Sequence, residues 1–356
     1  MSIQTQVIRV EPIHPDRKVI EIAAQAIRDG KLVAFPTETV YGLGANAFDA
    51  QAVQRIFTAK GRPLADPLIV HIAKKEDLTW VAKDIPPIAW RLGEKFWPGA
   101  LTLVLPKTEL IPLENTAGLS TVAVRVPAHP VALALLEGSQ VPIAAPSANR
   151  FGHTSPTTAQ HVFDDLAGEI DIILDGGATV IGVESTVLDI TCQPAQILRP
   201  GGVTLEQLQA VLGEVEVAHV PILKGKLEAI RSPGLLDKHY APKAKLILFI
   251  NANSGKALED MKEIAQEAYS NRQHLGILAV EEDLPFWGDF PADLYSLGEE
   301  NDLETVASRL YDGLRALDQK EVDLILVRDL GEVGLGLAIR DRLKRASNQV
   351  IMEKDD

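Results

Sequence analysis

Residues 35–44 read FPTETVYGLG, and the elements on either side of this stretch decide the fold class. The stretch follows a short apolar run, Lys31 to Phe35, which predicts a buried strand. A second helix is expected after it, from near Asp49 to about Ala59. Residues 36–44 are therefore predicted to form a loop that joins a buried strand to this helix.

Another helix is predicted before the strand. Asp16 can cap its start by accepting hydrogen bonds from the first N–H groups, and Gly30 can end it by taking the left-handed conformation. The buried face of this helix would consist of Val19, Ile20, Ala23, Ala24 and Ile27.

The alternation of strands and helices continues along the chain. Further strands are predicted at residues 67–72, 101–105, 122–126, 143–145, 170–174 and 186–190, with helical patterns between several of them. One short helix is predicted near 205–212, and residues 214–243 have no long periodic pattern. This order predicts an α/β domain with a mixed sheet, followed by a linker.

A second α/β pattern begins at Lys245. Predicted strands at 246–250, 275–280 and 322–327 alternate with helices near 257–269, 303–317 and 337–346. Two α/β domains are therefore expected in the 356 residues.

Composition and charge limit the classes of function. The net charge of −14 argues against a protein that coats nucleic acid, because phosphate contacts need clustered Lys and Arg. Residues 1–210 hold 17 Lys and Arg against 22 Asp and Glu, so any basic site in the first domain must be local. Cys192 is the only cysteine, which excludes an internal disulfide. With no signal-peptide pattern and no long apolar run, these features predict a cytoplasmic protein that does not contact membranes.

Familiar cofactor motifs are incomplete. Residues 255–257 (Gly-Lys-Ala) resemble the end of a phosphate-binding P-loop, but Ile250 stands where its first glycine belongs. Residues 334–336 (Gly-Leu-Gly) follow a predicted strand, but Ile339 replaces the third glycine of a dinucleotide fingerprint. Because Cys/His clusters are also missing, we expect no zinc, flavin or nicotinamide.

Polar residues after the predicted strands are the candidates for chemistry. Lys60 and Arg62 stand at the end of a helix, where they could neutralise a triphosphate or form a solvated helix terminus, and the spacing alone favours the second interpretation. Ser147 and Asn149 follow an apolar strand and are well placed for a ligand. The alternative for residues 146–156 is a turn in which Ser155 or Thr157 caps the next helix, and the sequence leaves both open.

Charged and polar residues near other strand ends form a third group. Arg125 and Arg199 lie among apolar neighbours, where they could form structural ion pairs or bind a carboxylate or phosphate. Residues 184–186 (Glu-Ser-Thr) are expected to form a turn with exposed hydroxyls. His71 ends an apolar strand, and a core histidine is the alternative to a ligand-binding one.

Three motifs occur in the order typical of the YrdC/Sua5 family. They are residues 35–44, Lys60-Gly61-Arg62-Pro63 with Asp66-Pro67-Leu68, and Pro146-Ser147-Ala148-Asn149, which include the family's KxR…SxN signature. Residues 8–210 resemble its synthase domain, which implies an α/β fold built on a YrdC-like twisted mixed sheet with helices. Residues 244–356 resemble the smaller, Rossmann-like α/β C-terminal domain of the Sua5 type.

Residues 211–243 resemble the linker of this family. Residues 231–234 (Arg-Ser-Pro-Gly) and 239–242 (His-Tyr-Ala-Pro) match its motif, although Leu235 stands where a methionine is common. Since a carbamate and a mixed anhydride are easily lost to water, we expect residues 231–240 to fold over the pocket as a lid, with Tyr240 reaching the nucleotide.

The resemblance implies a nucleotidyltransferase, an L-threonylcarbamoyladenylate synthase. L-threonine, bicarbonate (or CO₂) and ATP with Mg²⁺ would give threonylcarbamoyl-AMP and pyrophosphate. The product would supply N6-threonylcarbamoyladenosine at position 37 of tRNA, and a partner transferase would complete that modification.

The resemblance also implies two groups of site residues. The ATP group comprises Lys60, Arg62, Ser147, Asn149, Ser155 and Arg199, with Asp66, Thr121 and Tyr240 as further members. The threonine group comprises Thr37, Thr39, His71, Arg125, Ala145 and Ser185, with Arg125 as the partner of the amino-acid carboxylate. Lys60 and Arg62 would be catalytic through charge neutralisation, and the metal ligands stay unknown.

Two alternatives belong to other classes. One is a module that binds double-stranded RNA or tRNA, for which the acidic balance and the lack of an aromatic-rich basic stripe predict at most a weak tRNA contact. The other is a carbamoyl-phosphate-using transferase like the hydrogenase-maturation proteins, which contain cysteine-rich zinc segments that one cysteine cannot build.

Overall fold

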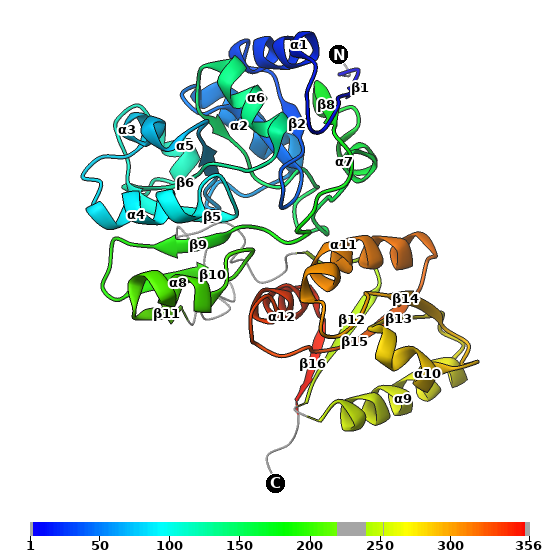
Figure 1. The fold of residues 1–356 in the computed structure, drawn as a ribbon. Coiled ribbons are helices and arrows are strands. Elements are labelled where there is room, and N and C mark those ends of the chain that lie inside the picture. Colours follow the sequence, from blue (N-terminus) through cyan, green and yellow to red (C-terminus); the bar gives the residue numbers. More distant parts are fainter. Residues whose placement is uncertain (1–2, 219–239, 252, 353–356) are drawn as a thin grey trace. The chain divides into compact units, whose positions relative to one another are not determined.

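A computed structural model describes residues 3–218, 240–251 and 253–352, and it divides the chain into two compact units (Figure 1). Unit 1 comprises Met1–Phe151, Ser155–Val180 and Glu184–Asp237, and unit 2 comprises Gly152–Thr154, Ile181–Val183 and Lys238–Asp356. Residues 231–239 of the predicted lid lie outside the described residues.

Unit 1 is built on a mixed sheet whose described strands number eleven, in the order β1-β8-β2-β3-β7-β4-β6-β5-β9-β10-β11. These strands are β1 (Gln6–Arg9), β2 (Val33–Phe35), β3 (Gly42–Asn46), β4 (Ile69–His71), β5 (Leu101–Pro106), β6 (Thr121–Arg125), β7 (Ile143–Ala144), β8 (Ile172–Asp175), β9 (Thr186–Asp189), β10 (Ala195–Arg199) and β11 (Val215–Val217). The helices are α1 (Arg17–Arg28), α2 (Ala50–Lys60), α3 (Leu78–Val81), α4 (Pro87–Phe96), α5 (Leu113–Thr116), α6 (Pro130–Ser139), α7 (Ala159–Leu166) and α8 (Leu205–Leu212), with the 3₁₀ turn η1 (Lys75–Asp77). The predicted α/β class with a mixed sheet is confirmed.

Helices α1 and α6 lie side by side over one end of the sheet (Figure 1). Asp16 caps α1 as predicted, because its carboxylate accepts hydrogen bonds from Lys18 N and Val19 N. The two helices and strands β2, β7 and β8 share one apolar core. This packing fixes the strands that precede the polar loops of unit 1.

Strand β3 corrects the prediction that residues 36–44 form a loop throughout. Residues 42–46 pair antiparallel with β2 on one side and with β7 on the other. The glycines made this segment unlike a strand, but the strand needs the one at position 44. A Cβ on Gly44 would lie 2.8 Å from both Ile143 Cγ2 and Phe35 Cε1, so only glycine fits there.

Unit 2 contains a parallel sheet in which five strands are described, in the order β14-β13-β15-β12-β16. The strands are β12 (Lys245–Ile250), β13 (Leu275–Ala279), β14 (Asp293–Ser296), β15 (Leu324–Arg328) and β16 (Gln349–Met352). Helices α9 (Ser254–Ser270) and α10 (Leu284–Trp287), with the 3₁₀ turn η2 (Glu281–Asp283) before α10, lie on one face, and α11 (Leu303–Gln319) and α12 (Gly336–Ala346) lie on the other (Figure 1). The sequence analysis missed β14 and β16, which are short strands at the edges of the sheet. Strand β14 is half-buried, and β16 is mostly exposed.

No helix among the described residues combines the length and apolar character needed to cross a membrane.

The turn between β10 and α8 depends on a glycine. A Cβ on Gly201 would lie 2.2 Å from Glu184 O, 2.4 Å from Ser185 C and 2.5 Å from Thr186 N, all of them backbone atoms. Gly201 therefore lets the backbone after β10 touch the turn before β9.

We predict that Gly201→Ala lowers the free energy of unfolding by about 3 kcal/mol, because backbone cannot move aside as a flexible side chain can. Urea unfolding measures this change. Gly255→Ala is the control, since its Cβ would meet only Asn253 Oδ1, at 3.2 Å, among the described neighbours. Equal midpoints for the two variants would show that the turn tolerates a side chain.

Candidate functional site

Backbone hydrogen bonds hold two of the polar motifs of unit 1 together. Leu43 N donates to Pro146 O at 2.8 Å, and Ala148 N donates to Tyr41 O at 2.8 Å. Strand β3 continues this contact by pairing with β7. Residues 146–149 therefore run beside the loop that precedes β3.

Lys60 joins the third motif to this pair. It ends α2, and Gly61 follows in the left-handed conformation with φ 65°. The Lys60 ammonium donates to Ser147 O at 2.6 Å and also to Asn149 O. Only 4% of Lys60 is exposed, so the interpretation as a solvated helix terminus is wrong. Burial, followed by repulsion from Arg62, holds the pKa of Lys60 well below its usual value.

Arg62 is held from one side by Asp66. Its Nη2 lies 2.9 Å from Asp66 Oδ2, and it also donates to Pro67 O at 2.8 Å. Arg62 Nε donates to Asp66 O at 3.1 Å. Both side chains are buried, so the guanidinium has one fixed orientation.

Ser147 and Asn149 form a local pair at the end of β7. Ser147 Oγ donates to Asn149 Oδ1 at 2.6 Å, and Asn149 Nδ2 donates to Arg150 O at 2.8 Å. Ser155 is buried and donates to Glu184 Oε1 at 2.6 Å. The predicted caps of α7, Ser155 or Thr157, are wrong, because Thr158 is extended and accepts from His161 N.

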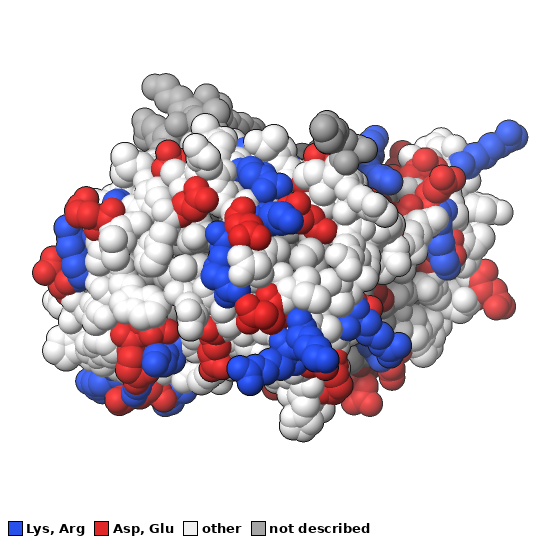
Figure 2. All heavy atoms as spheres, turned by 90° about the horizontal axis from the view of Figure 1, so that it is seen from above, with Lys and Arg blue, Asp and Glu red and all other residues white. Residues whose placement is uncertain are grey.

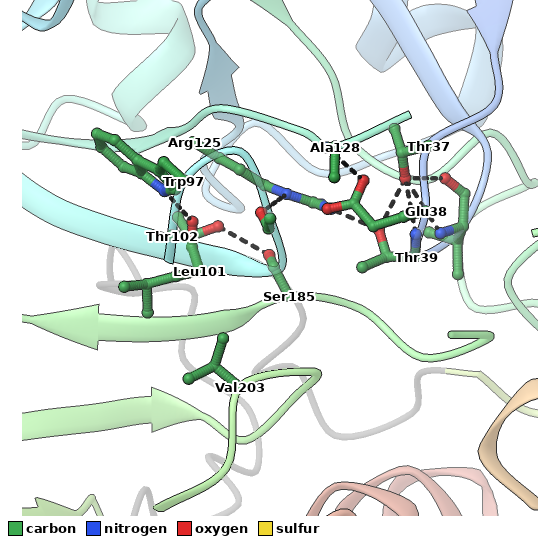
Figure 3. A network of polar contacts seen from close by, with 12 residues as sticks. Thr37, Glu38, Thr39, Trp97, Leu101, Thr102, Arg125, Ala128, Ser185 and Val203 are labelled. Carbon is green, nitrogen blue, oxygen red and sulfur yellow. Dashed lines mark hydrogen bonds and ion pairs between the residues drawn. The ribbon is translucent and has the colours of Figure 1, made fainter. Parts of the chain in front are cut away.

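Arg125 ends β6 and forms the centre of a second network (Figure 3). Its Nε donates to Gly99 O at 3.1 Å, and its Nη1 donates to Thr39 Oγ1 at 2.9 Å. Nη2 lies 2.7 Å from Glu38 Oε1. Thr39 Oγ1 in turn lies 2.8 Å from Thr37 Oγ1. A guanidinium held at three points among hydroxyls is suited to bind a carboxylate.

His71 ends β4 and stands opposite Arg125 in the parallel pairing of β4 with β6. It is 3% exposed, and its ring packs edge-on to Phe35. Burial, and then the charge of Arg125, lowers the pKa of His71 to about 3. The ring is therefore neutral at physiological pH, and its buried Nδ1 makes no hydrogen bond with the described residues.

Ser185 and Arg199 make a direct contact. Arg199 Nη2 donates to Ser185 O at 2.9 Å, and Ser185 Oγ lies 2.7 Å from Thr102 Oγ1 (Figure 3). The prediction of exposed hydroxyls at residues 184–186 is wrong, because Ser185 and Thr186 are fully buried. Gly201 allows this by bringing the backbone after β10 against the turn.

The remaining predicted site residues occupy three other places. Thr121 starts β6 and is half-buried, and Ala145 is buried with its N–H bound to Ile69 O at 2.9 Å. Tyr240 belongs to unit 2, where its ring lies 5.7 Å from the ring of Tyr311 and 5.2 Å from the Arg342 guanidinium.

Three polar residues of these networks were given no role in the sequence analysis. Glu38 contacts Arg125, Thr102 contacts Ser185, and Glu184 contacts Ser155. A signal existed for Glu38, which stands between two threonines in the first motif. Thr102 lies within the apolar strand β5, and nothing in that pattern distinguishes it from a core residue.

The two centres differ in what they can bind. Lys60 and Arg62 offer cations suited to phosphates, while Arg125 offers a cation among hydroxyls. No three His, Cys, Asp or Glu side chains of the described residues gather into a group that could hold a metal ion.

Comparisons with known proteins cover nearly the whole chain. The Sua5, YciO and YrdC family model, described as "Telomere recombination", matches residues 25–201, and the model of the threonylcarbamoyl-AMP synthase C-terminal domain matches residues 203–348. The threonylcarbamoyl-AMP synthase of Pyrococcus abyssi is 48% identical over 335 residues, 94% of this chain and 95% of that protein. The threonylcarbamoyl-AMP synthase of Bacillus subtilis is 47% identical over 327 residues, 91% of this chain and 92% of that protein. The crystal structure of P. abyssi Sua5 complexed with L-threonine aligns with a TM-score of 0.90 at 46% identity, covering 98% of this chain and 99% of that one.

The low pKa of His71 predicts a pH-dependent stability. Its folded pKa of about 3 lies below the ordinary value of 6.5, so the unfolded chain binds a proton that the folded chain excludes between these pH values. This contribution is complete above pH 6.5 and is lost as the pH falls toward 3, by roughly 1.4 kcal/mol per pH unit.

We expect the wild type to lose about 2 kcal/mol more than His71→Asn between pH 7.5 and pH 5.0 in urea unfolding. His14→Asn, at an exposed position, is the control and should follow the wild type. Parallel pH profiles for the wild type and His71→Asn would show that His71 is protonated without cost.

Proposed function

Because this chain belongs to the Sua5-type threonylcarbamoyl-AMP synthases, we propose that it converts L-threonine, bicarbonate (or CO₂) and ATP into L-threonylcarbamoyl-AMP and pyrophosphate. The product supplies the threonylcarbamoyl group of N6-threonylcarbamoyladenosine at position 37 of tRNA, which a partner transferase completes. The likeness of nearly the whole chain to a relative that binds L-threonine carries this proposal. The cytoplasm suits a chain with one cysteine.

In this proposal the centre around Lys60 binds the phosphates of ATP. Lys60, Arg62, Ser147, Asn149, Ser155 and Arg199 are its proposed members, with Asp66 and Thr121, all of them in unit 1. Burial opposes the charged form of Lys60, and the negative charge of a triphosphate favours it. Bound ATP would therefore raise the pKa of Lys60. The charged Lys60 ammonium would then be a fixed cation beside the α-phosphate.

The second centre binds the amino acid. Arg125 takes the carboxylate, and Thr37, Thr39, His71, Ala145 and Ser185 surround the rest of the molecule. The neutral His71 adds no charge beside Arg125. The Arg199–Ser185 contact links this group to the ATP group, so the two substrates would be held next to each other.

The chemistry needs positioning more than covalent help. The threonine ammonium group releases two protons to solvent as its nitrogen forms a bond to the carbon of CO₂ and becomes a carbamate. A carbamate oxygen then attacks the α-phosphorus, and the bond from this phosphorus to the oxygen that bridges to the β-phosphate breaks as pyrophosphate leaves. Most of the rate enhancement comes from two sources: fixed cations that face the developing charge, and a fixed orientation of the two substrates. We assign no general base.

Mg²⁺ is proposed to enter with ATP. The described residues contain no cluster of three acidic or imidazole side chains, and the Asp66 carboxylate is engaged by Arg62. The described residues therefore do not form a metal site by themselves. No step of the reaction is assigned to Mg²⁺.

Direct recognition of RNA lacks a supporting observation. On the face drawn in Figure 2, Lys and Arg side chains have acidic neighbours and do not form a broad basic area. Binding of a phosphate backbone depends on such an area.

We predict that pyrophosphate release requires ATP, L-threonine and bicarbonate together, and that L-serine supports it less well. The assay omits each component in turn and follows pyrophosphate. Release without threonine would instead indicate a nucleotide hydrolase, and no release at all would favour an RNA-binding role, which a salt-sensitive gel shift with tRNA would test.

Substitutions should separate the two groups. Lys60→Ala should lower kcat by roughly 100-fold, because it removes a cation at the reacting phosphate, and leave the Kd of threonine unchanged. Arg125→Ala should raise the Kd of threonine by roughly 10-fold or more, because the carboxylate loses its partner. Lys83→Ala, which removes an exposed cation, is the control. A loss of threonine affinity in Lys60→Ala equal to that in Arg125→Ala would contradict this assignment.

A further inference from the structure

Glu38 is a half-buried acid in the Arg125 network (Figure 3). Its side chain is 12% exposed, and it stands in the loop between Thr37 and Thr39. Glu38 Oε2 accepts a hydrogen bond from Ala128 N at 3.0 Å, which fixes the carboxylate on one side. A fixed carboxylate with one buried oxygen beside a proposed substrate-binding arginine calls for a physical explanation.

The other oxygen of Glu38 is only partly satisfied. Glu38 Oε1 lies 2.7 Å from Arg125 Nη2, but the contact lacks the direction of a hydrogen bond. Both atoms are buried, and neither makes a hydrogen bond with the described residues. Arg125 Nε and Nη1, by contrast, donate to Gly99 O and Thr39 Oγ1. Buried polar atoms without hydrogen bonds are rare, and a missing ligand is one reason for them.

The two unsatisfied atoms are one acceptor and one donor, side by side. An α-amino acid presents the complementary pair, because its ammonium nitrogen and nearer carboxylate oxygen are roughly 3 Å apart. We propose that Glu38 is a specificity-determining residue that accepts a hydrogen bond from the α-ammonium group of the substrate, while Arg125 binds its carboxylate. This inference rests on the proposed function, since it concerns the same amino-acid substrate.

Charge balance supports the assignment. Glu38 and Arg125 together are neutral, and so is a zwitterionic amino acid, so its binding buries no net charge. His71 stays neutral beside them. A carboxylic acid without the amine would bring an uncompensated negative charge next to Glu38 and leave Oε1 without a donor. A binding site discriminates strongly against an analogue that leaves one of the site's buried polar groups without a hydrogen-bond partner.

A comparison of two ligands separates this role from simple orientation of Arg125. The ligands are L-threonine and 3-hydroxybutyrate of matching configuration, which lacks only the α-amine. If Glu38 binds the ammonium group, removal of the Glu38 carboxylate weakens the binding of L-threonine alone. If Glu38 only orients Arg125, removal of the Glu38 carboxylate weakens the binding of both ligands equally, because Arg125 binds the carboxylate that both ligands carry.

The experiment measures the Kd of both ligands by calorimetry, without ATP or bicarbonate, for the wild type and Glu38→Gln. We expect the wild type to prefer L-threonine by roughly 10- to 100-fold, and this preference to fall to within about threefold in Glu38→Gln. An unchanged preference overturns the inference, whether the two affinities fall together or stay the same. Glu109→Gln removes an acid from an 89% exposed position and is the matched control.

Two further outcomes keep the inference separate from the proposed function. Should Glu38→Gln fail to fold, Glu38→Asp keeps the charge and should retain part of the preference, whereas an unchanged threonine Kd in that variant would count against the contact. A wild type that binds neither ligand would contradict the proposed function itself. A wild type that binds threonine with a preference independent of residue 38 contradicts only the role of Glu38.

Discussion

The backbone contact between β3 and β7 is the constraint on which the site depends. The hydrogen bonds from Leu43 to Pro146 and from Ala148 to Tyr41 extend this pairing into the loops on either side. Lys60 then reaches the same place from the end of α2 by donating to Ser147 O. Side chains on loops are positioned only as well as their backbones, and here the backbones are fixed by a sheet. Glycine at position 44 is part of this constraint, since a side chain there would push β3 away from Ile143.

Burial of charge gives the site its chemistry and costs stability. Arg62, Arg125 and Arg199 are all buried, and removing such ions from water is expensive even when they are paired. Lys60 has carbonyl groups as hydrogen-bond partners, and burial lowers its pKa. A chain selected only for stability would replace these residues with apolar ones. Their presence, and the unsatisfied atoms of Glu38 and His71, are the kind of local cost that functional sites carry.

The sequence was informative wherever one local pattern decides the outcome. The capped stripe of α1, the end of α2 and most apolar strands of unit 1 follow from periodicity and capping, and the three motifs led to the family. The sequence was not informative where a contact between distant residues decides whether a segment forms a strand or is buried. Strand β3 is a strand because β2 and β7 flank it, and Ser185 is buried because Gly201 packs against its turn. The pairing of Glu38 with Arg125 joins residues far apart in the chain, so spacing could not reveal it.

Both centres contain an arginine paired with a carboxylate, but the first adds the buried Lys60, and this difference suits the proposed substrates. ATP is highly anionic, so a buried cation whose charged form is opposed by burial gains most when ATP binds, and the lowered pKa of Lys60 marks such a group. A free amino acid is neutral overall, so its centre should be compensated before binding, as the Arg125–Glu38 pair and the neutral His71 are. Arg199 of the proposed ATP group donates to Ser185 O of the proposed threonine group. A carbamate formed on the amine would gain a negative charge, and cations of the proposed ATP group that face this charge would favour attack on the phosphate over return to the neutral amino acid.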